Sequence, residues 1–231
     1  STPGYTPFVL LNYKNKLEDI EVMMHELGHG IHYNLTDNKQ SYFSFDPGTP
    51  LAETASIFNE MLLAERIVKQ SKNKKEKIGL LATMLERQYA TISRQAYLVI
   101  FEKYAHENIS KGATKEDLDN YYYSLLKEQF GKMKIPSEYK SEWNYIPHIY
   151  LTPFYCYGYS WGGLVSISLY DMYQKEGKPF VDKYVDFLSS GGSASPYDTM
   201  NKIGANPESE EFWQGGFNII KDQISELKKL I

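Results

Sequence analysis

Residues 24–29 read Met24-His25-Glu26-Leu27-Gly28-His29, and this H-E-x-x-H stretch decides how the rest of the chain is interpreted. On a helix, residues four apart lie one above the other, with Cβ atoms roughly 5–6 Å apart. His25 and His29 can therefore direct two imidazoles at one metal ion. Imidazole suits Zn²⁺, and three protein ligands with one open position are typical of a catalytic zinc site. Glu26 is placed to accept a proton from the water at that position.

The residues around this motif predict a helix. Asn15, followed by Glu18 and Asp19, is typical of a capped helix start with acidic residues in the first turn. Gly28 and Gly30 are poor helix formers, by about 1 kcal/mol each relative to alanine, so we expect another backbone to approach closely here. Apolar residues that form the expected buried stripe recur at helical steps: Leu17, Ile20, Met24, Leu27 and Ile31.

A zinc site of this kind needs a third protein ligand. A second helix is predicted to begin at Thr49-Pro50, where a hydroxyl cap precedes a proline at the first helical position. Glu53 lies in its first turn, and Ser56 and Glu60 follow at three and seven positions. These three side chains share one face of the helix. The two carboxylates suit a metal ligand and a residue that supports a ligand.

The chain shows a family resemblance in several separate stretches. Around the motif they are His25-Glu26-Leu27-Gly28-His29-Gly30, Ala52-Glu53-Thr54-Ala55-Ser56 and Asn59-Glu60. These stretches resemble the oligoendopeptidase F branch of the thimet oligopeptidase family, which are zinc metallopeptidases of oligopeptides. Three further stretches resemble that branch in the same order: Pro7 to Tyr13, Pro147-His148 through Tyr157-Gly158-Tyr159, and Ser190 to Pro196.

The resemblance implies roles for the residues of the metal site. It implies His25, His29 and Glu53 as ligands of one Zn²⁺, Glu26 as general base and Glu60 as an outer carboxylate. It covers only the catalytic C-terminal part of a complete enzyme, because full-length members carry an N-terminal helical half that forms the opposite wall of a channel. A fragment that lacks this partner segment, a processed product and a naturally short relative are all compatible with it.

An aromatic tract from His148 to Trp161 is the second place where function is expected. Composition alone favours a core helix that starts near Thr152-Pro153. The resemblance implies instead that a histidine and tyrosines of this tract hydrogen-bond the substrate carbonyl oxygen as it becomes an oxyanion. His148, Tyr155 and Tyr159 match best, and Tyr150 stays open as an alternative to Tyr155.

Length and composition limit the class of protein. The chain has 231 residues, 42% of them hydrophobic, which suffices for one domain over 1–231 that needs no disulfide. The single Cys156 cannot pair within the chain, and no leader and no run of about 18 apolar residues is present, which favours the cytoplasm and argues against a membrane. A net charge of −4 argues against nucleic acid as the main partner.

The predicted fold is mainly α, a zincin-like helical metallopeptidase domain with a small N-terminal β element at Phe8 to Tyr13. In the family such an edge strand pairs with the substrate backbone, whereas a core strand is the plainer alternative. Tyr42 to Phe45 either line the site or anchor their loop. The predicted function is a zinc-dependent endopeptidase of oligopeptides. An exopeptidase with the same zinc chemistry, a zinc- and peptide-binding fragment without turnover, and a structural zinc domain are the alternatives.

Overall fold

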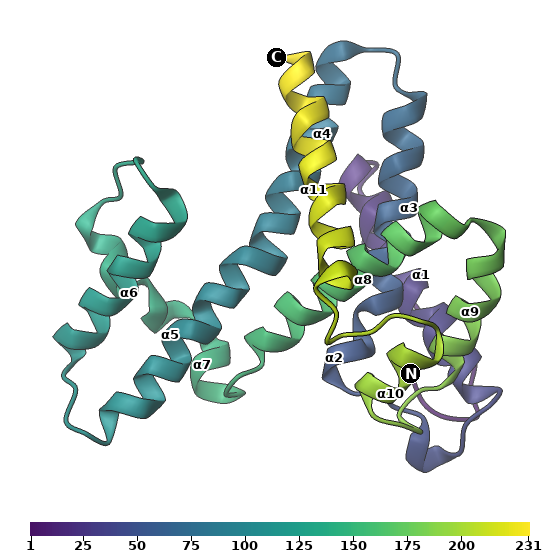
Figure 1. Ribbon diagram of the computed structural model, residues 1–231, viewed down its shortest axis with the longest axis horizontal. Coiled ribbons are helices and arrows are strands. Elements are labelled where there is room, and N and C mark those ends of the chain that lie inside the picture. Colours follow the sequence, from purple (N-terminus) through teal and green to yellow (C-terminus); the bar gives the residue numbers. More distant parts are fainter. The chain divides into compact units, whose positions relative to one another are not determined.

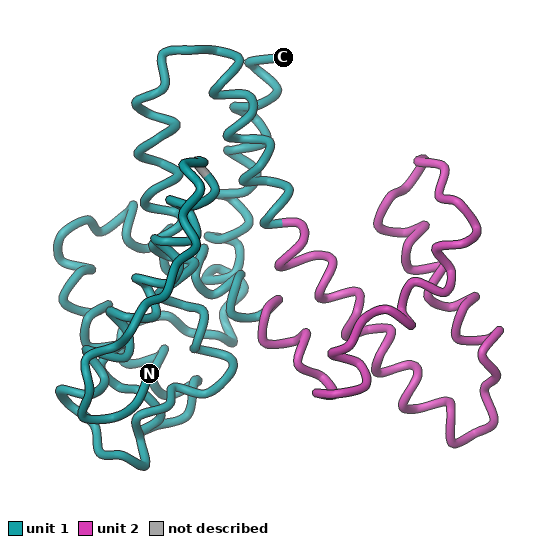
Figure 2. Tube along the Cα trace, turned by 180° about the vertical axis from the view of Figure 1, so that it is seen from behind, with its two compact units in different colours: residues 1–88, 161–231 teal, residues 89–160 magenta. Residues whose placement is uncertain are grey.

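The structure of the chain, a computed structural model, describes residues 1–231 apart from the side chain of Leu17. Every regular element in this described part is helical, which confirms the mainly α class (Figure 1). The chain divides into two compact units, residues 1–88 with 161–231 and residues 89–160 (Figure 2). Apart from the Leu17 position, none of the helices is both long and apolar enough to cross a membrane.

The first unit is organised around paired helices. In it, α1 packs along α3 and against α9, and α11 packs along α4 (Figure 1). Val165, Ile167 and Leu169 of α8 are fully buried, so α8 contributes to the centre of the core. The elements are α1 (Leu17–Asp37), η1 (Tyr42–Ser44), α2 (Thr49–Ala52), α3 (Thr54–Gln70), α4 (Lys74–Gln88), α8 (Cys156–Glu176, here from Trp161), α9 (Lys178–Ser189), α10 (Pro196–Lys202) and α11 (Glu210–Leu230).

The second unit has a core of its own. Its elements are the π-helical η2 (Tyr89–Ser93), α5 (Arg94–Ile109), α6 (Lys115–Phe130), the 3₁₀-helical η3 (Ser137–Tyr145), α7 (Pro147–Leu151) and the first turn of α8. The buried residues of this core are Leu98, Phe101, Ala105, Leu118, Tyr122, Leu125, Leu126, Trp143 and Cys156.

The predicted strand over Phe8 to Tyr13 is not observed. No strand occurs among the described residues, so this segment has no neighbour with which to exchange backbone hydrogen bonds. Phe8 and Leu10 are 91% and 97% exposed, and they do not form the core strand that was the plainer alternative. The apolar run alone could not reveal this, because a strand depends on a partner elsewhere in the chain.

The start of α1 is capped by an acidic side chain. The Asp19 carboxylate accepts hydrogen bonds from the backbone N–H groups of Lys14 and Lys16, at 2.7 and 2.8 Å. The helix begins at Leu17 with Lys16 as its N-cap, so the predicted cap Asn15, which has a positive φ of 65°, is wrong by one residue. The expected acidic support of the first turn is present, with Asp19 rather than Glu18 in the capping position.

The buried face of α1 differs from the predicted apolar stripe. Leu27 and Ile31 are 42% and 48% exposed, and the predicted contribution of Leu17 lies outside the described part of the chain. The buried positions of the helix's second half are instead small or polar: Gly28, His32 and Thr36. The Thr36 hydroxyl donates to the Leu188 carbonyl at 3.0 Å, which ties this face to α9. Ile20 and Met24 of the predicted stripe are partly buried, so hydrophobic periodicity was wrong for Leu27 and Ile31, where the closest helix contact, at Gly28, requires a small residue.

Gly28 is the point of closest approach between α1 and α3. A Cβ atom built on Gly28 would lie 2.5 Å from Cα of Ser56 and 2.6 Å from the Ala55 carbonyl oxygen, both backbone atoms. The expected close approach of another backbone is therefore found at this position. At Gly30 a Cβ would meet only side-chain atoms of Val9 and Pro7, at 3.9 and 4.0 Å, which is ordinary contact.

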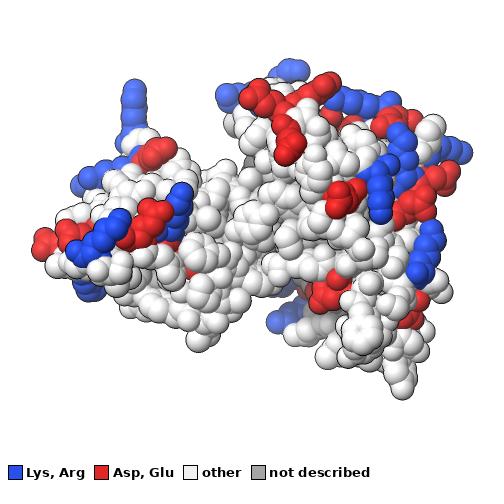
Figure 3. All heavy atoms as spheres, turned by 60° about the horizontal axis from the view of Figure 1, so that its bottom comes forward, with Lys and Arg blue, Asp and Glu red and all other residues white. Residues whose placement is uncertain are grey.

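The charged surface is mixed in sign. On the face drawn in Figure 3, Lys and Arg side chains alternate with Asp and Glu, and neither sign covers a large continuous area. Binding to a phosphate backbone needs a concentrated basic surface. The face drawn in Figure 3 shows no such concentration of basic side chains.

The contact at Gly28 can be tested by substitution. Gly28→Ala forces α1 and α3 apart, so we expect a loss of about 1–3 kcal/mol in the free energy of unfolding. Gly30→Ala is the matched control on the same helix. There the added methyl has room, and the gain in helix propensity should leave stability unchanged or raise it by up to about 1 kcal/mol. Thermal and denaturant unfolding measure both, and equal effects of the two substitutions would contradict the assignment.

Candidate metal centre

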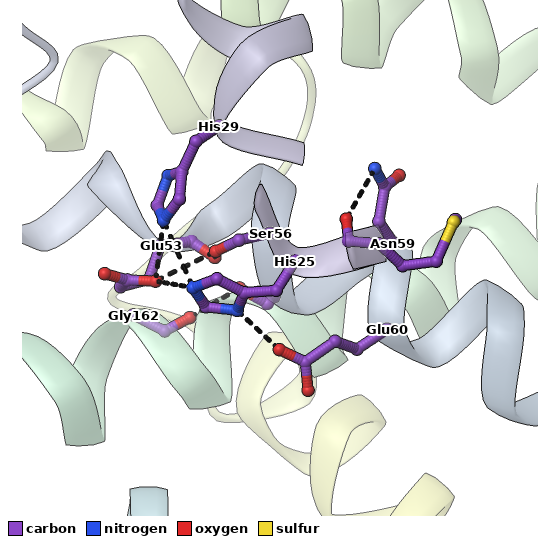
Figure 4. A network of polar contacts seen from close by, with 9 residues as sticks. His25, His29, Glu53, Ser56, Asn59, Glu60 and Gly162 are labelled. Atoms are coloured by element: carbon purple, nitrogen blue, oxygen red, sulfur yellow. Dashed lines mark hydrogen bonds and ion pairs between the residues drawn. The ribbon is translucent and has the colours of Figure 1, made fainter. Parts of the chain in front are cut away.

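The two motif histidines present their Nε2 atoms to a common point. His25 and His29 lie one turn apart on α1, and their Nε2 atoms are 3.2 Å from each other (Figure 4). The Glu53 carboxylate completes the group, with Oε2 at 3.4 Å from His25 Nε2 and 3.5 Å from His29 Nε2. All three side chains are partly buried. The structure thus brings together the three residues that were expected to hold a metal.

Glu53 sits at a break in the helix predicted from Thr49-Pro50. That helix does start at Thr49, but α2 ends at Ala52 and α3 starts at Thr54, with Glu53 between them at φ −85° and ψ −2°. The Ser56 hydroxyl lies 2.9 Å from both the Glu53 carbonyl oxygen and Glu53 Oε2, so it can donate to either. These contacts fix the direction of the carboxylate.

A third helix supports Glu53 from the other side. A Cβ on Gly162 of α8 would lie 3.0 Å from the Pro50 carbonyl oxygen and 3.8 Å from Cβ of Glu53. A glycine therefore lets α8 pack closely against the break between α2 and α3, beside the metal-binding group (Figure 4). Sequence reasoning missed Gly162. Its only signal is a glycine inside an otherwise regular helix, which often marks close packing.

Glu60 and Asn59 of α3 fix α1 at the site. His25 Nδ1 donates to Glu60 Oε1 at 2.5 Å, which orients the ring and leaves the lone pair on Nε2, where a metal would bind. The Asn59 amide donates to the Met24 carbonyl oxygen at 3.4 Å. The position of Glu60 is the one expected of an outer carboxylate that supports a ligand.

The carboxylates also set the electrostatics of His25. Burial lowers the pKa of this imidazole, but the hydrogen bond to Glu60 and the charges of Glu60, Glu53 and Glu26 outweigh burial and raise it. A higher pKa means that the surroundings stabilise positive charge at the ring. The same surroundings favour a divalent cation, which competes with the proton for the imidazole nitrogen.

The donor set fits a zinc ion. Ligands at about 2.0–2.1 Å from a tetrahedral ion lie roughly 3.3 Å from each other. The three separations here are 3.2, 3.4 and 3.5 Å, and the donors are two imidazole nitrogens and one carboxylate oxygen. This combination is the usual one for a catalytic zinc site that keeps one position open. Glu26, partly buried, follows His25 directly on α1.

The second group of expected residues lies in the unit of residues 89–160. His148 on α7 stacks on Tyr155 with ring centroids 5.6 Å apart, and both rings meet Tyr159 edge-on, at 5.7 and 5.1 Å. Tyr150 is not part of this cluster. Its ring is 54% exposed and stacks on Trp143, at 6.4 Å. Between the two tyrosines left open by the sequence, the geometry therefore groups Tyr155 with His148.

The loop at Tyr42 to Phe45 is anchored by a glycine turn. Phe45 is buried and stacks on Tyr33 at 5.1 Å, whereas Tyr42 and Phe43 are exposed. Gly192 N–H donates to the Ser44 carbonyl oxygen at 2.9 Å, and a Cβ on Gly191 or Gly192 would overlap this loop. The glycine-rich stretch Ser190 to Pro196 thus has a packing role.

Comparisons with known proteins agree with the site. The chain is 34% identical to oligopeptidase PepF of Bacillus subtilis over 99% of its length, and 34% identical to the chromosomal oligoendopeptidase F of Lactococcus lactis subsp. cremoris over 97%. The crystal structure of oligoendopeptidase-F from Enterococcus faecium superposes with a TM-score of 0.80 at 26% identity, over 93% of this chain.

The matched region is a part of each relative. The chain spans 34% of the Bacillus protein, 38% of the Lactococcus protein and 39% of the Enterococcus chain. Residues 4–219 match peptidase family M3, and this matched range includes both histidines, Glu53 and the aromatic tract. With nearly all of its sequence inside that match, the chain belongs to peptidase family M3.

Proposed function

We propose that this chain carries the catalytic centre of a zinc-dependent endopeptidase that hydrolyses internal bonds of oligopeptides. The convergence of His25 Nε2, His29 Nε2 and Glu53 Oε2, 3.2–3.5 Å apart, supports this most directly. Two of the relatives named above are oligoendopeptidases and one is an oligopeptidase, which supports the same substrate class here. Glu26 supports an enzyme over a structural zinc domain, because a closed site with four protein ligands needs no carboxylate base.

The residues of the metal centre divide the work of hydrolysis. His25, His29 and Glu53 would hold Zn²⁺, which supplies Lewis-acid chemistry and makes a water molecule acidic enough to lose a proton near neutral pH. Glu26 accepts that proton as the water oxygen attacks the scissile carbonyl carbon. When the C–N bond breaks, Glu26 returns the proton to the leaving amine nitrogen. Because the nucleophile is water, no acyl-enzyme forms.

His148, Tyr155 and Tyr159 are proposed to stabilise the charge that develops on the carbonyl oxygen. A phenol O–H or an imidazole N–H can donate to an oxygen that becomes negative, and such donors contribute most where they are held in place before the reaction. The mutual packing of the three rings supports this role, because each ring restricts the rotation of the other two.

One assay separates the proposal from its alternatives. The purified chain, loaded with zinc, is incubated with a fluorogenic oligopeptide whose amino and carboxyl ends are both blocked. Cleavage of this peptide supports an endopeptidase. Cleavage that requires a free terminus would assign an exopeptidase instead. Zinc and peptide binding without any cleavage would leave the chain as a binding fragment, and since it spans about a third of the relatives' length this outcome has to be tested.

The role of Glu26 predicts a separation of metal binding from turnover. Glu26→Gln keeps the shape of the side chain but cannot accept a proton, so we expect normal zinc content and loss of measurable cleavage. Elemental analysis and the cleavage rate are measured on the same preparation. Turnover within tenfold of the parent would remove Glu26 from the role of general base.

The two carboxylates of the metal centre predict different losses. Glu53→Ala removes a ligand atom, so zinc should be lost on dialysis. Glu60→Ala removes the partner of His25 Nδ1, so zinc affinity or activity should fall by about 10–100-fold, the usual effect of such a partner. Competition with a fluorescent chelator measures both affinities. The reverse order of effects would exchange the two assignments.

The aromatic cluster predicts a loss confined to the chemical step. Tyr159→Phe removes one hydroxyl, and if that hydroxyl donates mainly in the transition state, kcat falls by about 10²–10³-fold with KM little changed. Tyr155→Phe tests the second tyrosine. Tyr150→Phe is the control, since Tyr150 lies outside the cluster and should keep the parent's rate. Zinc content is verified in each variant, and parental kcat in all three would exclude the oxyanion role.

A further inference from the structure

A fully buried carboxylate lies beneath the turn that leads from α7 to α8. Glu102 of α5 is 0% exposed, and its Oε1 accepts the backbone N–H of Phe154 at 2.7 Å. His106, one turn later on α5, has its Nε2 at 3.8 Å from the same oxygen. Among the described residues, Glu102 Oε2 has no hydrogen-bond partner. All three residues belong to the unit of residues 89–160.

Phe154 has a backbone conformation that needs support from its surroundings. Its φ is +61°, the left-handed region, which is unfavourable for a bulky residue. Such a conformation costs of order 1–3 kcal/mol and persists only where neighbouring groups determine it. Here the Glu102 carboxylate fixes the Phe154 N–H, and the Phe154 ring packs on His106 at a centroid distance of 5.0 Å.

This conformation determines where the aromatic cluster lies. The left-handed residue stands between α7, which carries His148, and α8, which begins at Cys156. Tyr155 follows it directly, and Tyr159 lies in the first turn of α8. Cys156 is fully buried, and burial together with the nearby Glu102 carboxylate raises the pKa of its thiol. The hydrogen bond from the Phe154 N–H to Glu102 therefore lies directly before Tyr155.

A buried carboxylate at this place is a poor choice for stability alone. Removing a carboxylate from water is unfavourable unless its oxygens are well paired, and an apolar side chain of similar volume is often neutral or stabilising in its place. Glu102 offers what an apolar residue cannot, an acceptor for the Phe154 N–H. The benefit of the carboxylate is therefore that it fixes the conformation of the turn at Phe154.

We propose that Glu102 is a positioning residue that holds the turn at Phe154 and so aligns His148, Tyr155 and Tyr159. The catalytic part of this inference rests on the oxyanion role proposed above for these three residues. Glu102 itself does not touch the reacting atoms. Its effect passes through the backbone of Phe154 to the two tyrosines that flank the start of α8.

Two variants of similar volume test the acceptor. Glu102→Leu removes it and fills the space, whereas Glu102→Gln keeps an oxygen that can accept the Phe154 N–H. In Glu102→Leu we expect exchange of the Phe154 amide hydrogen to be at least tenfold faster, and weaker proton–proton cross-peaks between the His148 and Tyr155 rings. For zinc-loaded protein, kcat should fall by about 10–100-fold with KM little changed. In Glu102→Gln, the Phe154 exchange rate, the ring cross-peaks and kcat should all be close to those of the parent.

Asp119→Leu is the matched control. Asp119 is a second buried carboxylate of the same unit, and it accepts the Trp143 indole N–H at 2.8 Å rather than a backbone group of the turn. Its replacement should lower the melting temperature without changing Phe154 exchange or kcat. A loss of kcat in Asp119→Leu equal to that in Glu102→Leu would overturn the proposal, because both would then reflect general loosening of the unit.

The local and kinetic readouts separate this proposal from the function on which it rests. Unchanged Phe154 exchange and ring cross-peaks in Glu102→Leu would overturn the positioning role, whatever the rate. If the cross-peaks change in Glu102→Leu but its kcat stays parental, the positioning role stands only if Tyr155→Phe and Tyr159→Phe also keep the parental kcat, because that result removes the oxyanion role itself. The proposal fails if Tyr159→Phe has a low kcat while Glu102→Leu combines faster Phe154 exchange with the parental kcat. Alignment by Glu102 would then not matter for the reaction.

Discussion

The metal centre depends on the contact between Gly28 of α1 and the backbone at Ala55 and Ser56 of α3. Packed helices are usually 8–10 Å apart, with side chains between them. At Gly28 no side chain intervenes, and the missing Cβ would lie within 2.6 Å of two backbone atoms. Because Gly28 lies between His25 and His29, the closest approach coincides with the place where two imidazoles must meet Glu53. The two separations from Glu53 Oε2, 3.4 and 3.5 Å, depend on this contact, whereas the 3.2 Å between the imidazole nitrogens follows from their one-turn spacing on α1.

The sequence predicted those features that depend on local spacing. Two histidines four residues apart and a carboxylate face on the next helix indicated which side chains could meet, and the family resemblance implied Glu53 as the ligand and Glu60 as the outer carboxylate. The structure brings His25, His29 and Glu53 together, and it places Glu60 against His25. The pattern succeeded because helical geometry fixes which residues share a face. It also predicted a close backbone contact at Gly28, because a glycine inside a helix lowers the helix's stability unless another contact requires it.

The sequence failed where a local pattern depends on distant parts of the chain. The segment Phe8 to Tyr13 reads as a strand, but a strand needs a partner that the described residues do not provide. Thr152-Pro153 reads as a helix start, yet α8 begins at Cys156, because Phe154 takes a left-handed conformation that Glu102 stabilises from 52 residues away. No spacing rule within the aromatic tract contains that information.

Each group of site residues includes one residue that lies where helices are interrupted. Glu53 separates α2 from α3, and Tyr155 lies between α7 and α8. In a continuous helix each residue's direction is set by its neighbours, about 100° per residue, so a side chain cannot be redirected on its own. A break releases Glu53 from this constraint, and Ser56 and Gly162 then determine its direction. At the second break, Glu102 accepts the Phe154 N–H and His106 packs on the Phe154 ring, directly before Tyr155. Irregular backbone lowers the stability of the fold, so it persists only where neighbouring groups support it. Both breaks have such buried or closely packed support. This is what a site requires if it must hold side chains in fixed directions.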